Sequence, residues 1–484
     1  MRERSRANAL IFGAVLIIGV CAAIYATVFL KWVSAPRSGA AEASLKAAAA
    51  KAEAALVDAR RGFRSNLLDA RAHLRLSEAL WKAGRHVDSF FVAVSARELL
   101  GDDAFRAAHG AVVLKLGGPA AELRKRLAGV GDPAKAVPVH AEVARLHPDT
   151  AEGRDSLDTL TRLAQVDETS GGEAARLARA ALEELHRSDP KHPGKLAAFA
   201  LAALGRGDPG LAQAIANEAL AADPNHAGAA LAMGALALHL KEPDKAFPWL
   251  SLAWDRNPDD LYSAAKLAQL YDKRRNDPEA ALPFWLAIHR QNPDYEDGGP
   301  VERRIREVLD ARRERLLAHA GVESLGRYFT HEDGAIRAEA AARAAEYKDP
   351  RWIDALGTML DDDVELVRRS ADYALFKIGQ QEPEAVRARR DEWLAGDKPL
   401  TRIRALNLYA DLDGRNAYPR ALAALKDPVP AVRAFAKLMV LDYYYGEMPE
   451  ATKARAKYLA EERDPEAQAL LARFAPGAAR APRR

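Results

Sequence analysis

The sequence predicts an all-α protein, and three observations support that fold class. A phrase of Asp or Asn followed by Pro returns four times between residues 189 and 293, at steps of 34, 34 and 35 residues. Hydrophobic residues make up 49% of the chain but aromatic residues only 7%, so much of the apolar content is alanine, the strongest helix former. No stretch shows the β-branched alternation of a strand. A fixed period of this size is typical of stacked helical hairpins and predicts an α-solenoid.

The N-terminus contains an uncharged apolar run, Ala9 to Leu30, followed by Lys31 and Trp32. Its 22 residues would span about 33 Å as a helix, and a membrane hydrocarbon core is about 30 Å thick. We therefore expect residues 1–31 to form a short N-tail and a single transmembrane helix, with the membrane contacted through residues 9–30. A signal peptide cleaved near Ser38-Gly39-Ala40 is the alternative, although the run is long for a signal core.

The charges around the apolar run indicate its orientation. Arg2, Arg4 and Arg6 precede it, and only Glu3 opposes them. The positive-inside rule then predicts an N-terminus in the cytoplasm. The alanine- and arginine-rich composition suggests a bacterial protein, so the expected location is the inner membrane, with the bulk of the chain in the periplasm. A cytoplasm-facing orientation is the alternative.

Charge and cysteine content argue against several classes of function. The 71 lysines and arginines nearly balance 68 acidic residues, for a formal charge of +3, and the charges are mixed along the chain. A nucleic-acid-binding protein more often concentrates basic residues on one face, so we expect no nucleic-acid partner. The single cysteine, Cys21, excludes an intrachain disulfide and a cysteine metal cluster. Lipidation of Cys21 is not favoured, because Val20 stands where the lipoprotein motif has a small residue.

The segments before the clearest repeats are also predicted to be helical. Residues 32–62 are alanine-rich, with almost no bulky apolar face, which favours a stalk helix or a linker. Residues 63–300 follow as a solenoid of hairpins. Its first, degenerate unit lies between Asp69 and Leu100, with a turn at Gly84. The clearest repeats occupy residues 190–293.

These repeats resemble the tetratricopeptide repeat family in the positions of their small residues. With the proline placed at repeat position 32, the family's small positions 8, 20 and 27 are small here in eight of nine cases. In three successive units they are Ala200, Ala212 and Ala219; Gly234, Ala246 and Ala253; and Ala268, Ala281 and Ile288. Small residues let two helices cross closely, and Ile288 departs from that pattern in the last unit.

The resemblance implies a concave groove on the first helix of each hairpin, which would bind a protein or peptide partner. The groove positions map onto Ala197, Leu201, Leu204, Leu231, Ala235, Leu238, His239, Tyr262, Ala265 and Gln269. Some co-chaperones of the family hold a C-terminal carboxylate in a Lys/Asn/Arg clamp there. Because Ala197 and Leu201 stand where that clamp would begin, we expect an apolar groove for an apolar or helical segment. The alternative is a groove filled by the chain's own helices.

Residues 301–320 are predicted to form a highly charged connector helix, followed by a second kind of repeat at 321–475 and a basic tail at 476–484. The second repeat resembles the HEAT family, in which an acid precedes a hydrophobic-arginine pair. The two best copies are Asp362 with Val367-Arg368 and Asp427 with Val432-Arg433. Weaker copies occur at Ile336-Arg337 and Ile403-Arg404, where His331 and Lys398 replace the acid. The resemblance implies an Asp to Arg ladder between repeats, intact at Asp362, Arg368, Asp427 and Arg433.

The chemical motifs in the chain have structural interpretations. Gly205 to Gly210 spells GxGxxG, but the dinucleotide fingerprint follows a strand and this segment follows a predicted helix, so we expect a turn. The histidines lack the spacing of metal ligands, and the acid run Asp361-Asp362-Asp363 is expected from helix N-capping. In the cluster Tyr443-Tyr444-Tyr445, one tyrosine per helical turn should face the core and at most one or two should be free to bind, so we expect a structural role. We therefore predict no enzymatic activity, no catalytic residues, no cofactor and no metal.

The sequence thus predicts a membrane-anchored, non-enzymatic scaffold or adaptor for protein–protein interaction, suited to envelope assembly or secretion. A regulatory adaptor of the same architecture that faces the cytoplasm is the alternative. A nucleic-acid-binding HEAT-like protein is a minor alternative. The residues do not identify the partner.

Overall fold

The computed structural model describes residues 39–113, 132–146, 148, 151–165, 168–295 and 300–473, and every regular element in these ranges is a helix. The all-α prediction is therefore confirmed for the described part of the chain. The chain divides into two compact units, Met1–Ala55 and Leu56–Arg484. In the first unit, the described residues form the start of α2 (Gly39–Ser65), and most side chains from Lys46 onward are exposed.

Two predicted segments lie outside the described residues: the membrane anchor at 9–30 and the basic tail at 476–484. A search of the described helices finds none that is both long and apolar enough to cross a membrane.

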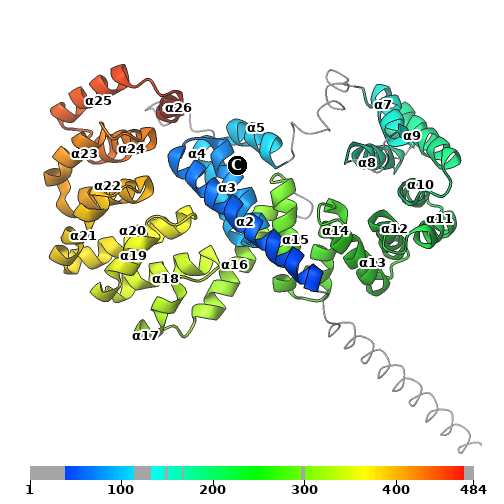
Figure 1. Ribbon diagram of the computed structural model, residues 1–484, viewed down its shortest axis with the longest axis horizontal. Coiled ribbons are helices and arrows are strands. Elements are labelled where there is room, and N and C mark those ends of the chain that lie inside the picture. The colour runs from blue at the N-terminus through cyan, green and yellow to red at the C-terminus, as the bar shows by residue number, and fades with distance from the viewer. Residues whose placement is uncertain are drawn as a thin grey trace, which may run out of the picture. The chain divides into compact units, whose positions relative to one another are not determined.

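The second unit continues as antiparallel helical hairpins (Figure 1). Before the 34-residue repeats come α3 (Ala70–Lys82), α4 (His86–Leu100), α5 (Asp102–Val112), α7 (Pro133–Leu146), α8 (Ala151–Gln165) and α9 (Glu168–Ser188). The repeats themselves form α10 (Pro193–Gly205), α11 (Pro209–Ala222), α12 (Ala227–His239), α13 (Pro243–Arg256), α14 (Leu261–Gln269) and α15 (Pro278–Gln291).

Each hairpin of the repeats turns at one residue with a left-handed backbone. These residues are Gly207, Lys241 and Asn276, with φ of 78°, 60° and 53°. A proline begins the second helix of each hairpin, where its missing N–H costs nothing. The GxGxxG segment is the first of these turns: Gly207 reverses the chain and Asp208 caps α11 by accepting a hydrogen bond from Leu211 N at 3.0 Å.

The 35-residue step of the last repeat has a local cause. Between α14 and the turn at Asn276, residues Leu270–Arg274 form a π-helix, and Arg275 N donates to Leu270 O at 3.1 Å, a bond that spans five residues. A π-turn accommodates one residue more than an α-turn. The inserted residue is therefore absorbed inside the helix, and the turn and the following helix keep the geometry of the other repeats.

The α3–α4 hairpin contacts helices that lie far along the sequence. Helix α4 packs on α15, α18 (Gly334–Tyr347) and α20 (Glu365–Gln381), and Figure 1 shows the blue hairpin beside them. Phe90 and Phe91 belong to one hydrophobic core with Leu286 of α15. Leu56 and Phe63 of α2 belong to a second core, shared with residues 400–470. The hairpin predicted as the first unit of the solenoid is thus packed on both α15, in the last of the repeats, and the C-terminal helices.

The predicted connector at 301–320 corresponds to α16 (Val301–Leu317). Ile305, Val308, Leu309 and Leu317 of this helix are buried, whereas Leu316 is 43% exposed. The remaining helices are α17 (Val322–Leu325), α19 (Ile353–Met359), α21 (Pro383–Ala395), α22 (Pro399–Asp413), α23 (Tyr418–Ala424), α24 (Pro430–Phe435), a π-helix (Ala436–Tyr444), α25 (Pro449–Glu461) and α26 (Pro465–Arg473), with short 3-10 turns at 326–328, 350–352 and 414–417.

Candidate functional site

The repeated Asp/Asn-Pro phrase ends on the residue that caps the next helix. His192, His226 and Asp260 each stand two residues after the proline and are the N-caps of α10, α12 and α14. The Nδ1 atom of His192 accepts from Gly194 N at 3.2 Å, and that of His226 accepts from Ala229 N at 3.2 Å. Because Nδ1 is the acceptor, a neutral ring carries its proton on Nε2. The 34-residue period therefore places equivalent polar groups at the same end of successive first helices.

Small residues bring these first helices close together. A methyl group built on Gly228 would lie 3.1 Å from Cβ of Ala197, which is tighter than nearly all real contacts. A methyl group on Gly194 would lie 3.7 Å from Nε2 of His226. The start of α12 therefore packs on α10, and the two capping histidines face the same space.

A groove of about 580 Å³ lies along these helices. Its lining is half polar and half apolar, and it draws on α8, α10, α12, α13 and the connecting turns. The lining residues are Pro148, Arg154, Leu157, Asp158, Thr161, His192, Gly194, Ala197, Ala198, Leu201, Asp223, Asn225, His226, Ala227, Gly228, Leu231, Ala253, Arg256, Asn257 and Asp260. The volume falls within the roughly 300–1,000 Å³ of typical ligand sites.

The groove contains charges of both signs, and some of these side chains form hydrogen bonds with residues of the connecting turns. Arg256 donates to Oδ1 of Asn225 at 3.1 Å, which joins the turns of two neighbouring repeats. Asp260 accepts from the backbone N of Ser263 at 2.9 Å, and it also accepts from the hydroxyl of that residue. The groove thus contains both positively and negatively charged side chains. Its described lining lacks the cluster of cations that would hold a lone carboxylate.

The structure places three of the ten predicted groove residues on this surface: Ala197, Leu201 and Leu231. The other seven do not line it. Ala235 and Ala265 are buried in helix packing, Leu204, Leu238 and Gln269 are half-buried, and His239 and Tyr262 are exposed. The polar half of the groove, above all His192 and His226, was not predicted. The signal was present in the sequence, because both histidines follow the repeated Asp-Pro phrase at the same offset.

The nine crossing positions are all buried. Ala200, Ala219, Ala246 and Ala268 have no exposed surface, and Ile288 is equally buried on α15. The larger Ile288 side chain is accommodated in the core that also contains Phe90 and Leu309. The last hairpin therefore buries a larger side chain at this position, within a core that it shares with α4 and α16.

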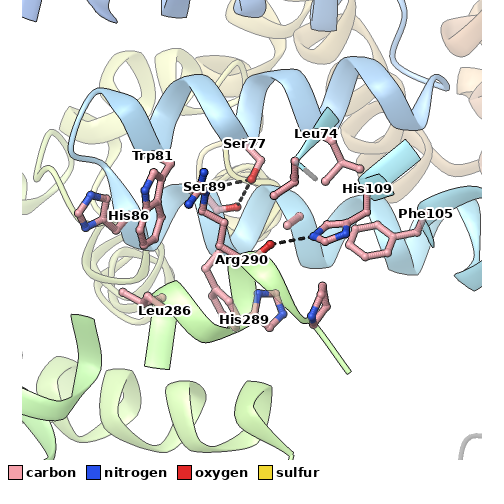
Figure 2. Close-up of a pocket in the computed structure, with 14 residues that line it drawn as sticks. Leu74, Ser77, Trp81, His86, Ser89, Phe105, His109, Leu286, His289 and Arg290 are labelled. Atoms are coloured by element: carbon pink, nitrogen blue, oxygen red, sulfur yellow. Dashed lines mark hydrogen bonds between the residues drawn. The ribbon is translucent and has the colours of Figure 1, made fainter. Parts of the chain in front are cut away.

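The joint between the α3–α5 segment and α15 is a second cluster of polar and aromatic groups (Figure 2). His109 Nε2 lies 2.8 Å from the carbonyl oxygen of Arg290, and the Arg290 guanidinium binds both carboxylate oxygens of Glu78 at 2.9 and 3.0 Å. Burial lowers the pKa of His289 to about 3, so the ring stays neutral against Phe90. The cavity here holds only about 10 Å³, about one water at most. This cluster is a packed joint and not a ligand site.

Four arginines occupy equivalent positions in the C-terminal repeats (residues 321–473). Arg337, Arg368, Arg402 and Arg433 each donate to the carbonyl oxygen six residues earlier in the chain. The third copy is therefore centred on Arg402, two residues before the Arg404 predicted from the sequence. Arg404 instead pairs with Glu365 and Asp372.

Side-chain ion pairs then connect one C-terminal repeat to the next. Arg337 binds Asp362 at 2.9 and 2.8 Å, and Arg402 binds Asp427 at 2.9 Å through both nitrogens. Arg433 continues to Glu462 at 2.9 and 3.0 Å. Arg368 pairs within its own helix with Glu365, at 3.0 and 2.7 Å. Of the predicted ladder residues, Asp362 and Asp427 receive their side-chain bonds from the preceding repeat's arginine.

The acid run before α20 is paired with three arginines from two helices, α2 and α18. Asp361 accepts from Arg64 at 3.2 Å, Asp363 accepts from Arg60 at 2.8 Å, and Asp362 holds Arg337. Within the described ranges, no group of three or more His, Cys, Asp or Glu side chains is arranged to hold a metal ion. The acid run therefore fastens α2 to the C-terminal repeats.

Of the tyrosine cluster, Tyr445 is buried and donates to the Gly414 carbonyl oxygen at 2.7 Å. Tyr444 donates to Asp411, and Tyr443 is 79% exposed.

Comparison with known proteins identifies the repeats. Residues 203–270 match the family model of the tetratricopeptide repeat. These residues span α11, α12 and α13 and thus much of the groove. Repeats of this type generally mediate protein–protein interaction, and every regular element in the part of the chain that the structure describes is a helix. No curated protein matches the chain. Among solved structures, a monomeric mutant of IFIT1 with m7Gppp-AAAA is 14% identical, with 83% of this chain and 94% of that chain covered and a TM-score of 0.24. A TM-score this low supports no argument about this chain.

Proposed function

We propose that this chain is a non-enzymatic scaffold that binds a segment of a partner protein in the groove along α8, α10 and α12. The observation that supports the proposal is the groove itself, which has a volume of about 580 Å³ and is lined by Ala197, Leu201, Leu231 and the capping histidines. Of these residues, His226 and Leu231 lie in the segment that matches the tetratricopeptide repeat. An extended or helical segment suits it, because apolar side chains would meet the two leucines while backbone amides would meet the polar turns.

We also propose that residues 9–30 anchor this scaffold in a membrane, with the bulk of the chain in the periplasm of a bacterium. The support is the 22-residue uncharged run and the three arginines before it. A role in envelope assembly or secretion would follow from that location. A reporter that is active only outside the cytoplasm, fused after Arg484, should be active, and a silent reporter with an active cytosolic counterpart would reverse the orientation.

The groove is tested by site-specific crosslinking in cells. A photoreactive amino acid in place of Leu201 or of Leu231 should crosslink the full chain to the same partner protein. The matched control is Leu211, which is 37% exposed on α11 and does not line the groove. Leu231→Glu should then weaken binding of the purified partner without lowering the melting temperature. Equal crosslinking from all three positions, or none from the groove, would contradict the proposal.

A further inference from the structure

The helices α10 and α12 begin on histidine caps that line the groove. Nδ1 of His192 accepts from Gly194 N at 3.2 Å and from Lys195 N at 3.4 Å, and Nδ1 of His226 accepts from Ala229 N at 3.2 Å. Both histidines are half-buried, so water reaches them. The first helix of the next repeat, α14, is capped instead by the carboxylate of Asp260.

The two histidine caps exist only while the imidazoles are neutral. A protonated imidazole carries a hydrogen on both ring nitrogens and cannot accept from a backbone amide. Histidine is the side chain that ordinarily changes charge between about pH 5 and 8, whereas a carboxylate stays ionised over that range. Protonation in mild acid would therefore remove the acceptors that cap α10 and α12 and leave the cap of α14 in place.

A protonated His226 would also lie beside two helix N-termini. It caps α12, and a methyl group built on Gly194, in the first turn of α10, would be 3.7 Å from its Nε2 atom. A helix N-terminus carries a partial positive charge, so a cation there is unfavourable. The lost cap and the added charge thus act in the same direction, and both loosen the first turns of α10 and α12.

These first turns are part of the groove wall. Gly194 and Ala197 of α10 and Ala227 and Gly228 of α12 line the groove. A change in the first turns therefore reaches the surface that a partner would contact.

Protonation would also reverse the sign of the groove's charge. The charged groups beside the two caps are Arg154 and Asp158 of α8, Asp189 and Asp223 of the turns, Lys195 of α10, Arg256 of α13 and Asp260 before α14. Lys195 pairs with Asp189 at 3.6 Å. The other five line the groove and give it a formal charge of −1 with neutral imidazoles and of +1 with both imidazoles protonated.

We propose that the groove holds its partner at neutral pH and releases it in mild acid, with His192 and His226 as the two groups that respond. This inference rests on the function proposed for the groove and adds its regulation. The partner segment loses the wall formed by the first turns of α10 and α12. The reversed charge also repels any basic side chain that the neutral groove favours.

The caps are tested on the full chain in detergent, without a partner. Hydrogen exchange is measured at about pH 5.5 and 7.5 and divided by the intrinsic rate at each pH. Protection in the first turns of α10 and α12 should fall about fivefold in acid, the effect of one lost cap, and protection in α14 should not change.

A double variant, His192→Asn with His226→Asn, keeps a neutral acceptor at every pH, because asparagine is a strong N-cap. Its protection should be equal at both pH values. His239→Asn is the matched control, since His239 is exposed in the last turn of α12 and does not line the groove. This control should respond to acid as the unmodified chain does.

Binding is tested with the photoreactive amino acid in place of Leu231, in permeabilised cells equilibrated at either pH. Crosslinking to the partner should fall at least about fivefold at the lower pH and stay unchanged in the double variant.

Three results would contradict this inference in different ways. An equal loss of protection in α14, or a loss that persists in the double variant, would overturn the role of the two histidines. Caps that respond to acid while crosslinking is equal at both pH values would overturn the release and leave the function of the groove intact. Absence of crosslinking at both pH values would overturn the proposed function, and the release with it.

Discussion

Gly234 on α12 lies directly against Leu250 on α13. A methyl group built on Gly234 would be 2.7 Å from Cδ2 of Leu250 and 3.3 Å from its backbone N. Contacts below 3.0 Å require the neighbour to move, and Leu250 is fully buried, so it has little room to do so. The two helices of this tetratricopeptide repeat therefore cross at a distance that only glycine permits.

Gly234→Ala should lower the free energy of unfolding by about 1–3 kcal/mol, because it overpacks this crossing. Gly62→Ala is the matched control. Gly62 lies inside α2 with nothing within 4 Å of a built methyl group, so alanine there should stabilise by about 0.5–1 kcal/mol. Denaturant unfolding of both variants measures the difference, and effects of the same sign would show that the crossing is not tight.

Asp427→Ala should be among the most destabilising changes in the C-terminal repeats. It leaves the Arg402 guanidinium, whose side chain is 10% exposed, without its two-nitrogen partner, and it removes the acceptor for Val429 N at 2.8 Å. A broken buried pair costs about 3 kcal/mol or more. Asp391→Ala removes a surface partner of Arg420 and should cost less than about 1 kcal/mol.

Measurements of unfolding can also test whether the unpaired charge of Arg402 causes the loss of stability in Asp427→Ala. Because the penalty comes from an uncompensated charge, Arg402→Met combined with Asp427→Ala should recover much of the stability lost in the single variant. A double variant as unstable as Asp427→Ala would mean that the lost cap of Val429, and not the bare guanidinium, causes the effect.

The features that could be predicted from the sequence are those that recur with the repeat period. The small residues at the helix crossings, such as Gly234 and Ala246, recur with the repeat, and so do the turns. The groove was predicted from apolar positions alone, and only Ala197, Leu201 and Leu231 lie on it, because His192 and His226 enter it from the helix caps.

In the C-terminal repeats, the pattern of a hydrophobic residue before arginine pointed to Arg404. The structure uses Arg402, where Thr401 precedes the arginine in place of the usual hydrophobic residue. Gly396 stands at the position equivalent to Asp362 and Asp427, and it has no carboxylate. Arg368 therefore has no acid to bind in the next repeat and pairs with Glu365 of its own helix. A single sequence does not show that Arg402 takes the place of Arg404 or that Arg368 pairs within its own helix.

The packing of α2 and of the α3–α4 hairpin could not be predicted from the sequence. Their partners lie roughly 200–400 residues away, as with Arg60 and Asp363 or Arg290 and Glu78. Helical periodicity shows which face of a helix is apolar but not what covers it.

Acid should weaken the C-terminal end through Glu462. Burial raises the pKa of this carboxyl, but hydrogen bonds from Arg433 and Tyr458 outweigh burial and lower the pKa to about 2. The folded-state pKa is thus below the unfolded value of about 4.5, so this stabilisation is complete above pH 4.5 and is lost as the pH falls toward 2. The contribution is on the order of 3 kcal/mol.

Glu462→Gln should remove this part of the pH dependence, as measured by hydrogen exchange of α25 and α26 between pH 2.5 and 5. Glu461→Gln is its neighbour and control: Glu461 is exposed and lies 3.9 Å from Lys457, so its loss should change little. A pH dependence that persists in Glu462→Gln would assign the effect to other carboxylates.

Phe63→Ala should destabilise helices far from α2 in sequence. The Phe63 ring is 2% exposed, and its centroid lies 4.8 Å from that of the His73 ring in an edge-to-face arrangement. Phe63 shares a core with Leu406 and Tyr409 of α22. Its truncation should cost about 3–5 kcal/mol through lost burial and the cavity left behind. Val57→Ala on the same helix, at a side chain that is 48% exposed, should have a small effect. Hydrogen exchange should show protection lost in α22 as well as in α2, since one core joins them; a loss confined to α2 would mean that the C-terminal repeats are stable without it.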